Sequence, residues 1–114
     1  MSDMPKKLGK PPKTYLDFMQ RFPRVGKAWD LVGEAGREGP LDDKCARLVK
    51  LALAIGAMRE GAVHSAVRKA LAVGVTHDEI DQVIALAAGS LGFPATVAIF
   101  SWIEETVPEK RRAR

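Results

Sequence analysis

The chain has 114 residues, of which 46% are hydrophobic and 28% are charged, and this size and composition fit one globular domain with a single core. No apolar run reaches the roughly 18 residues that cross a bilayer, and no apolar segment of a secretory signal follows the N-terminus, so we expect a cytoplasmic protein. The net charge of +4 belongs to the two ends, since residues 1–13 and residues 109–114 each carry +3, which leaves −2 for the body between them.

Charge and proline content divide the chain into three predicted parts. Residues 1–13 form a basic arm, because three prolines among lysines cannot build a packed element. Residues 14–108 form a helical domain, and residues 109–114 form a basic tail. Short basic ends bind nucleic acid weakly and without specificity, but solvated tails are the simpler interpretation, so we do not expect a nucleic-acid partner.

Two helices are predicted before the glycine–proline break at residues 39–40. The first runs from Thr14, which is expected to cap it, to about Phe22. Pro23 ends this helix, and a second helix follows over residues 24–37. Its apolar residues recur at helical spacing, and we expect them to form a buried face: Val25, Ala28, Trp29, Leu31 and Val32.

The third predicted helix begins at Asp42, whose carboxylate is expected to cap it, and runs to about Ile55 or Ala57. Apolar residues cover much of its circumference, so we expect this helix to be central. Cys45 is the single cysteine of the chain, which excludes an intrachain disulfide, and we expect it to be a small buried side chain. Arg47 places a charge on this helix and needs a partner, for which Glu60 is the natural candidate.

Three further helices complete the predicted domain. The fourth covers residues 58–74 and ends at Gly74, which fits a left-handed position. Thr76 and Glu79 form a capping box that starts the fifth helix, and Pro94 lies in the first turn of the sixth. No stretch alternates in polarity over a useful length, so no strand is predicted. The fold class is therefore all-α, an antiparallel bundle of about six helices.

Several segments of the domain resemble one protein family. They are Leu41–Lys44, Arg68–Ile80 and Gly92–Ala95, and the segment Phe22–Trp29 is similar to the family's preceding helix. Together they resemble the carboxymuconolactone decarboxylase-like family, which includes the alkylhydroperoxidase-D-like proteins. The resemblance implies an alkylhydroperoxidase-D-like helical fold and a homo-oligomer, typically a trimer or a hexamer.

The catalytic pattern of the family's peroxidase branch does not match this chain. That branch places Cys-x-x-Cys at the start of the fourth helix, a histidine one turn later and a glutamate on the preceding helix. Here the cysteine positions fall on Arg59 and Ala62, the histidine position on Ala66 and the glutamate position on Arg47. Without a thiolate nucleophile and a resolving thiol, thiol peroxidase activity is not expected. The decarboxylase branch uses the same histidine, and in this helix only the position of Arg68 fits the family pattern.

A polar strip on the fourth helix is the candidate replacement for this chemistry. Glu60, His64 and Arg68 follow one another at intervals of four residues, so they share one helix face. As a catalytic site, Glu60 would orient His64, His64 would move a proton and Arg68 would hold a carboxylate. The same spacing is also typical of a hydrated helix face or of a polar contact between subunits. Two potential ligands do not define a metal site, so the sequence assigns no metal, and no cofactor is expected.

Four further residues are assigned to substrate binding. Arg59 would add positive charge where the fourth helix begins, and Arg47 lies at the family's glutamate position. Trp29 and Trp102 would line a pocket, although aromatic residues at helical spacing more often belong to a core or an interface.

Two functions are therefore open for a protein of this kind. The first is a small-carboxylate-binding or proton-transfer protein that uses His64 and Arg68, with decarboxylase or lactone-type activity as the enzymatic version. The alternative is a non-catalytic oligomeric scaffold that has lost the family chemistry.

Overall fold

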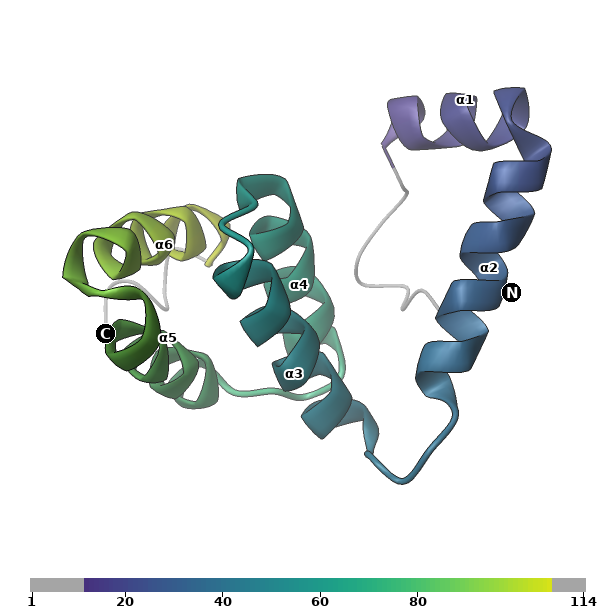
Figure 1. Cartoon of the computed structure of the whole chain (residues 1–114). Helices are drawn as coiled ribbons and strands as arrows, with labels where there is room; N and C mark the ends of the chain where they lie inside the picture. Colours follow the sequence, from purple (N-terminus) through teal and green to yellow (C-terminus); the bar gives the residue numbers. More distant parts are fainter. Residues whose placement is uncertain (1–11, 108–114) are drawn as a thin grey trace. The chain divides into compact units, whose positions relative to one another are not determined.

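The computed structural model describes residues 12–107, which form six α-helices (Figure 1). Their bounds are Lys13–Arg21 for α1, Pro23–Arg37 for α2, Asp43–Gly56 for α3, Glu60–Ala72 for α4, His77–Leu91 for α5 and Phe93–Thr106 for α6. No strand occurs in this part of the chain, which confirms the predicted all-α class and number of helices. None of the described helices is long and apolar enough to cross a membrane. The predicted basic tail and residues 1–11 of the predicted arm lie outside the described residues.

Contacts divide the described helices into two compact units, with α1 and α2 in one and α3 to α6 in the other. In the smaller unit, the rings of Phe18 and Phe22 lie 4.9 Å apart, and α2 begins with Pro23 in its first turn. A Cβ atom on Gly26 would lie only 3.1 Å from the Sδ atom of Met19, so a glycine allows the close approach of the two helices. The ring contact of Phe18 with Phe22 and the close approach of Gly26 to Met19 therefore hold α1 against the start of α2.

Two predictions for the smaller unit are wrong. The N-cap of α1 is Pro12 rather than Thr14, and no side chain caps this helix. The expected buried face of α2 is exposed, with Trp29 at 56% and Leu31 at 61% of full exposure. Helical periodicity shows which residues share a face of a helix. Two short helices, however, have too little surface to bury an apolar face of either one. The exposed residues are Val25, Ala28, Trp29, Leu31 and Val32.

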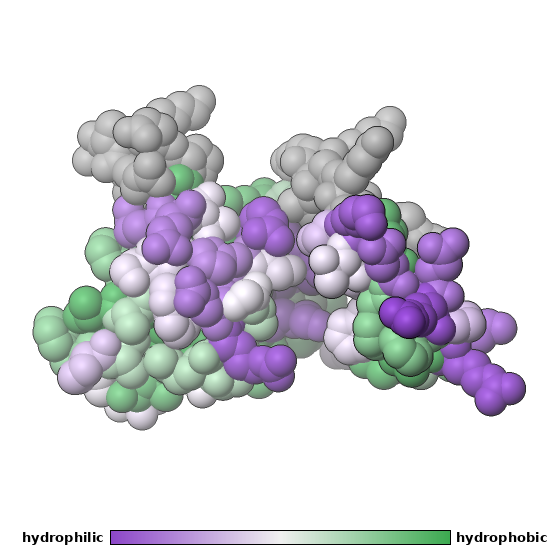
Figure 2. Space-filling view, turned by 90° about the horizontal axis from the view of Figure 1, so that it is seen from above, coloured by the Kyte–Doolittle hydropathy of each residue, from purple (hydrophilic) through white to green (hydrophobic). Residues whose placement is uncertain are grey.

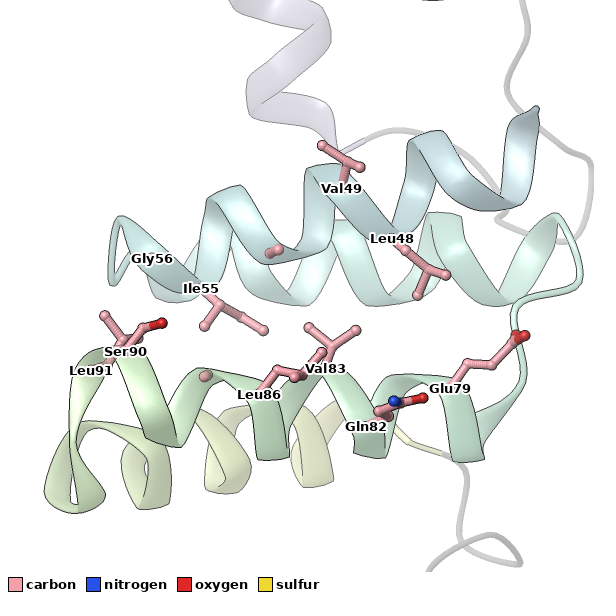
Figure 3. Close-up of a pocket in the computed structure, with 12 residues that line it drawn as sticks. Leu48, Val49, Ile55, Gly56, Glu79, Gln82, Val83, Leu86, Ser90 and Leu91 are labelled. Atoms are coloured by element: carbon pink, nitrogen blue, oxygen red, sulfur yellow. The ribbon is translucent and has the colours of Figure 1, made fainter. Parts of the chain in front are cut away.

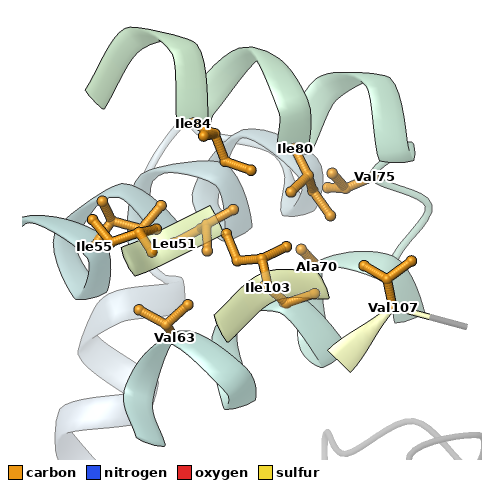
Figure 4. Close-up of a cluster of buried hydrophobic side chains, with 11 residues drawn as sticks. Leu51, Ile55, Val63, Ala70, Val75, Ile80, Ile84, Ile103 and Val107 are labelled. Atoms are coloured by element: carbon orange, nitrogen blue, oxygen red, sulfur yellow. The ribbon is translucent and has the colours of Figure 1, made fainter. Parts of the chain in front are cut away.

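The larger unit is a four-helix bundle in which α3 and α6 each lie beside both α4 and α5. Short connections join α3 to α4 and α5 to α6, as is typical of antiparallel neighbours. The apolar stripes of the four helices meet in one core (Figure 4). Its buried members are Leu51, Ile55, Val63, Val67, Ala70, Val75, Ile80, Ile84, Ile99, Ile103 and Val107.

The predicted starts of α3 and α5 are confirmed. The Asp42 carboxylate accepts a hydrogen bond from the Cys45 backbone N–H at 2.8 Å. The Thr76 hydroxyl accepts from the Glu79 N–H at 3.0 Å, and the Glu79 carboxylate accepts from the Thr76 N–H at 2.8 Å. The backbone hydrogen bond from Thr76, together with Lys44 at 3.3 Å, lowers the pKa of Glu79. The contribution of Glu79 to stability is therefore present above the ordinary pKa of a glutamate and is lost as the pH falls through the lowered value.

Gly74 follows the end of α4 and has the predicted left-handed conformation, with φ at 96°. The Val75 N–H donates to the Ala70 carbonyl at 3.0 Å, and the Gly74 N–H donates to the Leu71 carbonyl at 3.1 Å. These two hydrogen bonds are those of a Schellman motif, and the buried side chains of Val75 and Ala70 provide its hydrophobic contact. The motif fixes the direction in which the chain leaves α4 toward α5.

An apolar groove of about 550 Å³ runs between α3 and α5 (Figure 3). Leu48, Val49 and Ile55 line it from α3, and Val83 and Leu86 line it from α5. Leu86 is 66% exposed, and apolar side chains reach the surface on the face that Figure 2 displays. The four helices of the larger unit therefore leave an apolar surface that they do not cover themselves.

Candidate functional site

His64 lies in the second turn of α4, next to the last turn of α6. Its Nε2 atom lies 3.3 Å from Oε2 of Glu60, one turn earlier on α4, and 3.7 Å from Oε1 of Glu105 on α6. One nitrogen of His64 and one oxygen of each glutamate all lie within 4.8 Å of one another. The structure therefore brings together two residues of the predicted strip and adds a carboxylate from α6.

Thr106 determines the orientation of the imidazole. Its hydroxyl donates a hydrogen bond to the Trp102 carbonyl at 3.2 Å, and the same oxygen lies within hydrogen-bond distance of Nδ1 of His64. Two arrangements satisfy these contacts. In one, Nδ1–H donates to the Thr106 oxygen and the lone pair of Nε2 faces the two carboxylates, so that a cation at Nε2, either a proton or a metal ion, satisfies all three groups at once. In the other, the Thr106 hydroxyl donates to Nδ1 and Nε2–H donates to Glu60.

The cluster is packed on one side and open on the other. The side chain of His64 is 24% exposed, whereas those of Glu60 and Glu105 are 53% and 63% exposed. The ring is held by the contact between α4 and α6, and the carboxylates stay hydrated. Their attraction to an imidazolium is therefore partly screened by water, but a small molecule or an ion has access to the cluster.

Glu105 and Thr106 were not found by analysis of the sequence. They lie more than 40 positions after His64, and spacing arguments reach only three or four residues along one helix. The sequence offers Glu104 and Glu105 as equal candidates near the end of α6. Only the packing of α6 against α4 selects Glu105, so no signal in a single sequence identifies it.

Arg68 of the polar strip and Arg59, which was assigned to substrate binding, lie at exposed positions near His64. Arg68 follows His64 by one turn of α4, and no hydrogen bond or ion pair between the two occurs in the described structure. Arg59 is the residue before α4 and does not cap it with its side chain. Met58, with φ at 56°, turns the chain there, so α4 begins at Glu60, two residues later than predicted.

Three other residues were assigned to substrate binding, and none of them belongs to the cluster of Glu60, His64 and Glu105. Arg47 is half-buried on α3, and Glu60 contacts His64, so the expected pair of Arg47 with Glu60 is absent among the described residues. Trp102 packs partly buried against the core of the larger unit. Trp29 belongs to the smaller unit, so a pocket lined by both tryptophans stays a prediction.

Cys45 is exposed, so the prediction of a buried side chain is wrong. It lies in the first turn of α3, where the helix begins at the surface, and the apolar stripe runs along other positions. A hydrogen bond with the Asp42 carboxylate raises the pKa of the Cys45 thiol. The fraction of reactive thiolate at neutral pH is therefore lower than for an ordinary cysteine, which disfavours a nucleophilic role.

Comparison with known proteins assigns the family. The family model described as "Carboxymuconolactone decarboxylase family" matches residues 23–105, which run from the start of α2 to the penultimate residue of α6 and contain Glu60, His64 and Glu105. No curated protein and no solved structure matches the chain significantly. The match covers well over half of the sequence and agrees with the all-α fold. The chain therefore belongs to the carboxymuconolactone decarboxylase family.

Proposed function

We propose that this protein transfers protons through His64 and does not act as a thiol peroxidase. The observation that supports the proposal best is the placement of the Nε2 atom of His64 beside two carboxylates, with Nδ1 bound to Thr106. Histidine is the side chain that most often serves as a general acid or base. Arg59 and Ala62 stand at the positions of the family's two cysteines, so neither can supply a thiol.

In the proposed reaction, Nε2 of His64 takes a proton from a carbon atom next to a carbonyl group. The imidazole becomes a cation, and the carboxylates at 3.3 Å and 3.7 Å stabilise it. Thr106 keeps the ring in place through Nδ1 while the charge changes. The imidazolium then returns the proton to the carbanion. In a decarboxylation no proton is abstracted first: His64 starts as the imidazolium, the bond to the carboxylate breaks as carbon dioxide leaves, and Nε2 donates its proton to the carbanion that remains.

Arg68 extends the proposal to a substrate with a small carboxylate group. A guanidinium binds a carboxylate through two parallel hydrogen bonds. Glu60 and Glu105 repel an anion close to the imidazole, but Arg68 lies eight residues from Glu60, about 12 Å along the helix. A substrate carboxylate at Arg68 would therefore lie on the side of His64 away from Glu60.

The first prediction is that replacement of His64 by alanine abolishes proton exchange. In deuterium oxide, the protein should speed the loss of protons next to the carbonyl group of keto acids or unsaturated lactones, followed by NMR. His64→Ala should lower the protein-dependent rate about 10²-fold or more, because general acid–base catalysis typically contributes that much.

His77→Ala is the matched control, since it removes the other histidine of the chain and lies outside the cluster. It should keep the wild-type rate, which excludes exchange by any surface imidazole. Equal rates for wild type and His64→Ala across the whole panel would refute the proposed catalysis.

The oligomeric scaffold is the second candidate, and the uncovered apolar surface favours it. The groove between α3 and α5 and the exposed apolar residues of α2 would both be covered if copies of the chain associate. This function needs no turnover, and it is compatible with the loss of the family's cysteines. Proton transfer and oligomerisation do not exclude each other.

The second prediction concerns this association. Wild-type protein should be a trimer or a hexamer by light scattering after gel filtration, and Leu86→Glu should dissociate it, because a charge in the groove opposes burial. Ala85→Glu is the control, since it adds the same charge to an adjacent exposed position that does not line the groove. A monomeric wild-type protein would exclude the scaffold.

A further inference from the structure

We infer that Glu60, His64 and Glu105 form a binding site for one divalent transition-metal ion. The inference uses the same cluster as the proposed function. A metal ion occupies the lone pair of Nε2 that proton transfer requires, so the two are alternative states of one site, and proton exchange is measured in the presence of a chelator. Metal binding does not depend on turnover and is measured by itself. The sequence offered two potential ligands on α4, and the structure adds a third from α6. Three protein ligands are the number found in open metal sites, which keep a further position for water or substrate.

The distances in the cluster fit such an ion. Zinc binds histidine nitrogen and carboxylate oxygen at about 2.0–2.2 Å, so the ligand atoms of a tetrahedral site lie roughly 3.3–3.6 Å apart. Nε2 of His64 lies 3.3 Å from Oε2 of Glu60 and 3.7 Å from Oε1 of Glu105. The two carboxylate oxygens lie within 4.8 Å of each other. An ion can therefore be bound by the three atoms once the exposed carboxylates move together by up to about 1 Å.

Thr106 supplies the support that metal-binding histidines require. Such histidines almost always donate their second N–H to a nearby oxygen, which fixes the ring and leaves the other nitrogen free to coordinate. Nδ1 of His64 lies within hydrogen-bond distance of the Thr106 oxygen. In the tautomer that metal binding selects, Nδ1–H donates to this oxygen, whose own proton goes to the Trp102 carbonyl. The lone pair of Nε2 is then on the side of the two carboxylates.

Charge also favours a cation at this place. Glu105 is the penultimate residue of α6, where the partial negative charge at the end of the helix adds to that of its carboxylate. An ion of charge +2 balances both carboxylates and relieves this repulsion. One imidazole nitrogen with two carboxylate oxygens suits zinc, cobalt or manganese, whereas calcium takes six to eight oxygen ligands and magnesium is held mainly by oxygens.

The test is metal binding by the full chain after treatment with a chelator. Zinc is titrated in a calorimeter, and cobalt is titrated by its visible absorption, whose intensity distinguishes tetrahedral from octahedral coordination. Wild-type protein should bind one ion per chain. His64→Ala and Glu105→Gln should each weaken binding at least about 10-fold, and Thr106→Val should weaken it about 10- to 100-fold, the effect typical of a lost supporting contact.

Glu104→Gln is the matched control, because it removes the neighbouring carboxylate of α6 that does not belong to the cluster. It should bind like the wild type, and circular dichroism should show all variants folded. Wild-type protein that takes up neither ion, or undiminished binding by both His64→Ala and Glu105→Gln, would overturn the metal site. Metal binding without proton exchange would refute the proposed function alone, and exchange without metal binding would refute this inference alone.

Discussion

Replacement of Leu51 by alanine should lower the free energy of unfolding by about 2–5 kcal/mol, the largest loss we expect from a single side chain. Leu51 is fully buried in the core formed by α3 to α6. Truncation removes the apolar atoms and leaves a cavity that closely packed neighbours fill only in part. In thermal unfolding followed by circular dichroism, the midpoint should fall by about 10 °C or more.

Leu53 provides the control for this prediction on the same helix. It lies two positions after Leu51 but is 66% exposed, so Leu53→Ala removes the same atoms from the surface. Its effect on the free energy of unfolding should stay within about 0.5 kcal/mol. A large loss for Leu53→Ala and a small one for Leu51→Ala would show that the core is not the one described.

Replacement of Gly74 by alanine should destabilise the protein by about 1–3 kcal/mol, because a side chain at φ 96° is strained. The loss comes from the backbone alone, since a Cβ atom there would meet nothing within 4 Å. Urea unfolding should show a lower midpoint with an unchanged slope.

Gly89→Ala should have the opposite sign. Gly89 lies within α5, its backbone is helical, and a Cβ atom there would also meet nothing within 4 Å. Alanine should stabilise the protein by about 0.4–1 kcal/mol by restricting the unfolded chain. If both glycines respond alike, the left-handed conformation of Gly74 is not what determines the effect.

Most of the fold was predictable because its signals are local. A cap such as Asp42 or the pair of Thr76 with Glu79 acts within one turn, and the left-handed glycine at position 74 acts within two residues. The predictions that failed concerned the burial of side chains, which depends on the other parts of the structure that pack on them. The spacing of apolar residues in α2 was read correctly as one face, but nothing local determines whether that face is buried.

The candidate site was predictable only in part for the same reason. Glu60 and His64 contact each other because four residues separate them on α4. Glu105 and Thr106 reach the imidazole only because α6 packs beside α4, and this packing is decided by the shared core. The sequence thus shows which side chains lie on one helix face, whereas the meeting of two faces depends on the tertiary structure.

The absence of any buried residue from α1 and α2 has a consequence for how the chain folds. Helices of 9 and 15 residues are marginal in water without extensive packing. All of the described core residues lie between positions 51 and 107, so the hydrophobic core that stabilises the fold belongs to the larger unit. The amide hydrogens of α1 and α2 should therefore exchange with solvent faster than those of α3 to α6.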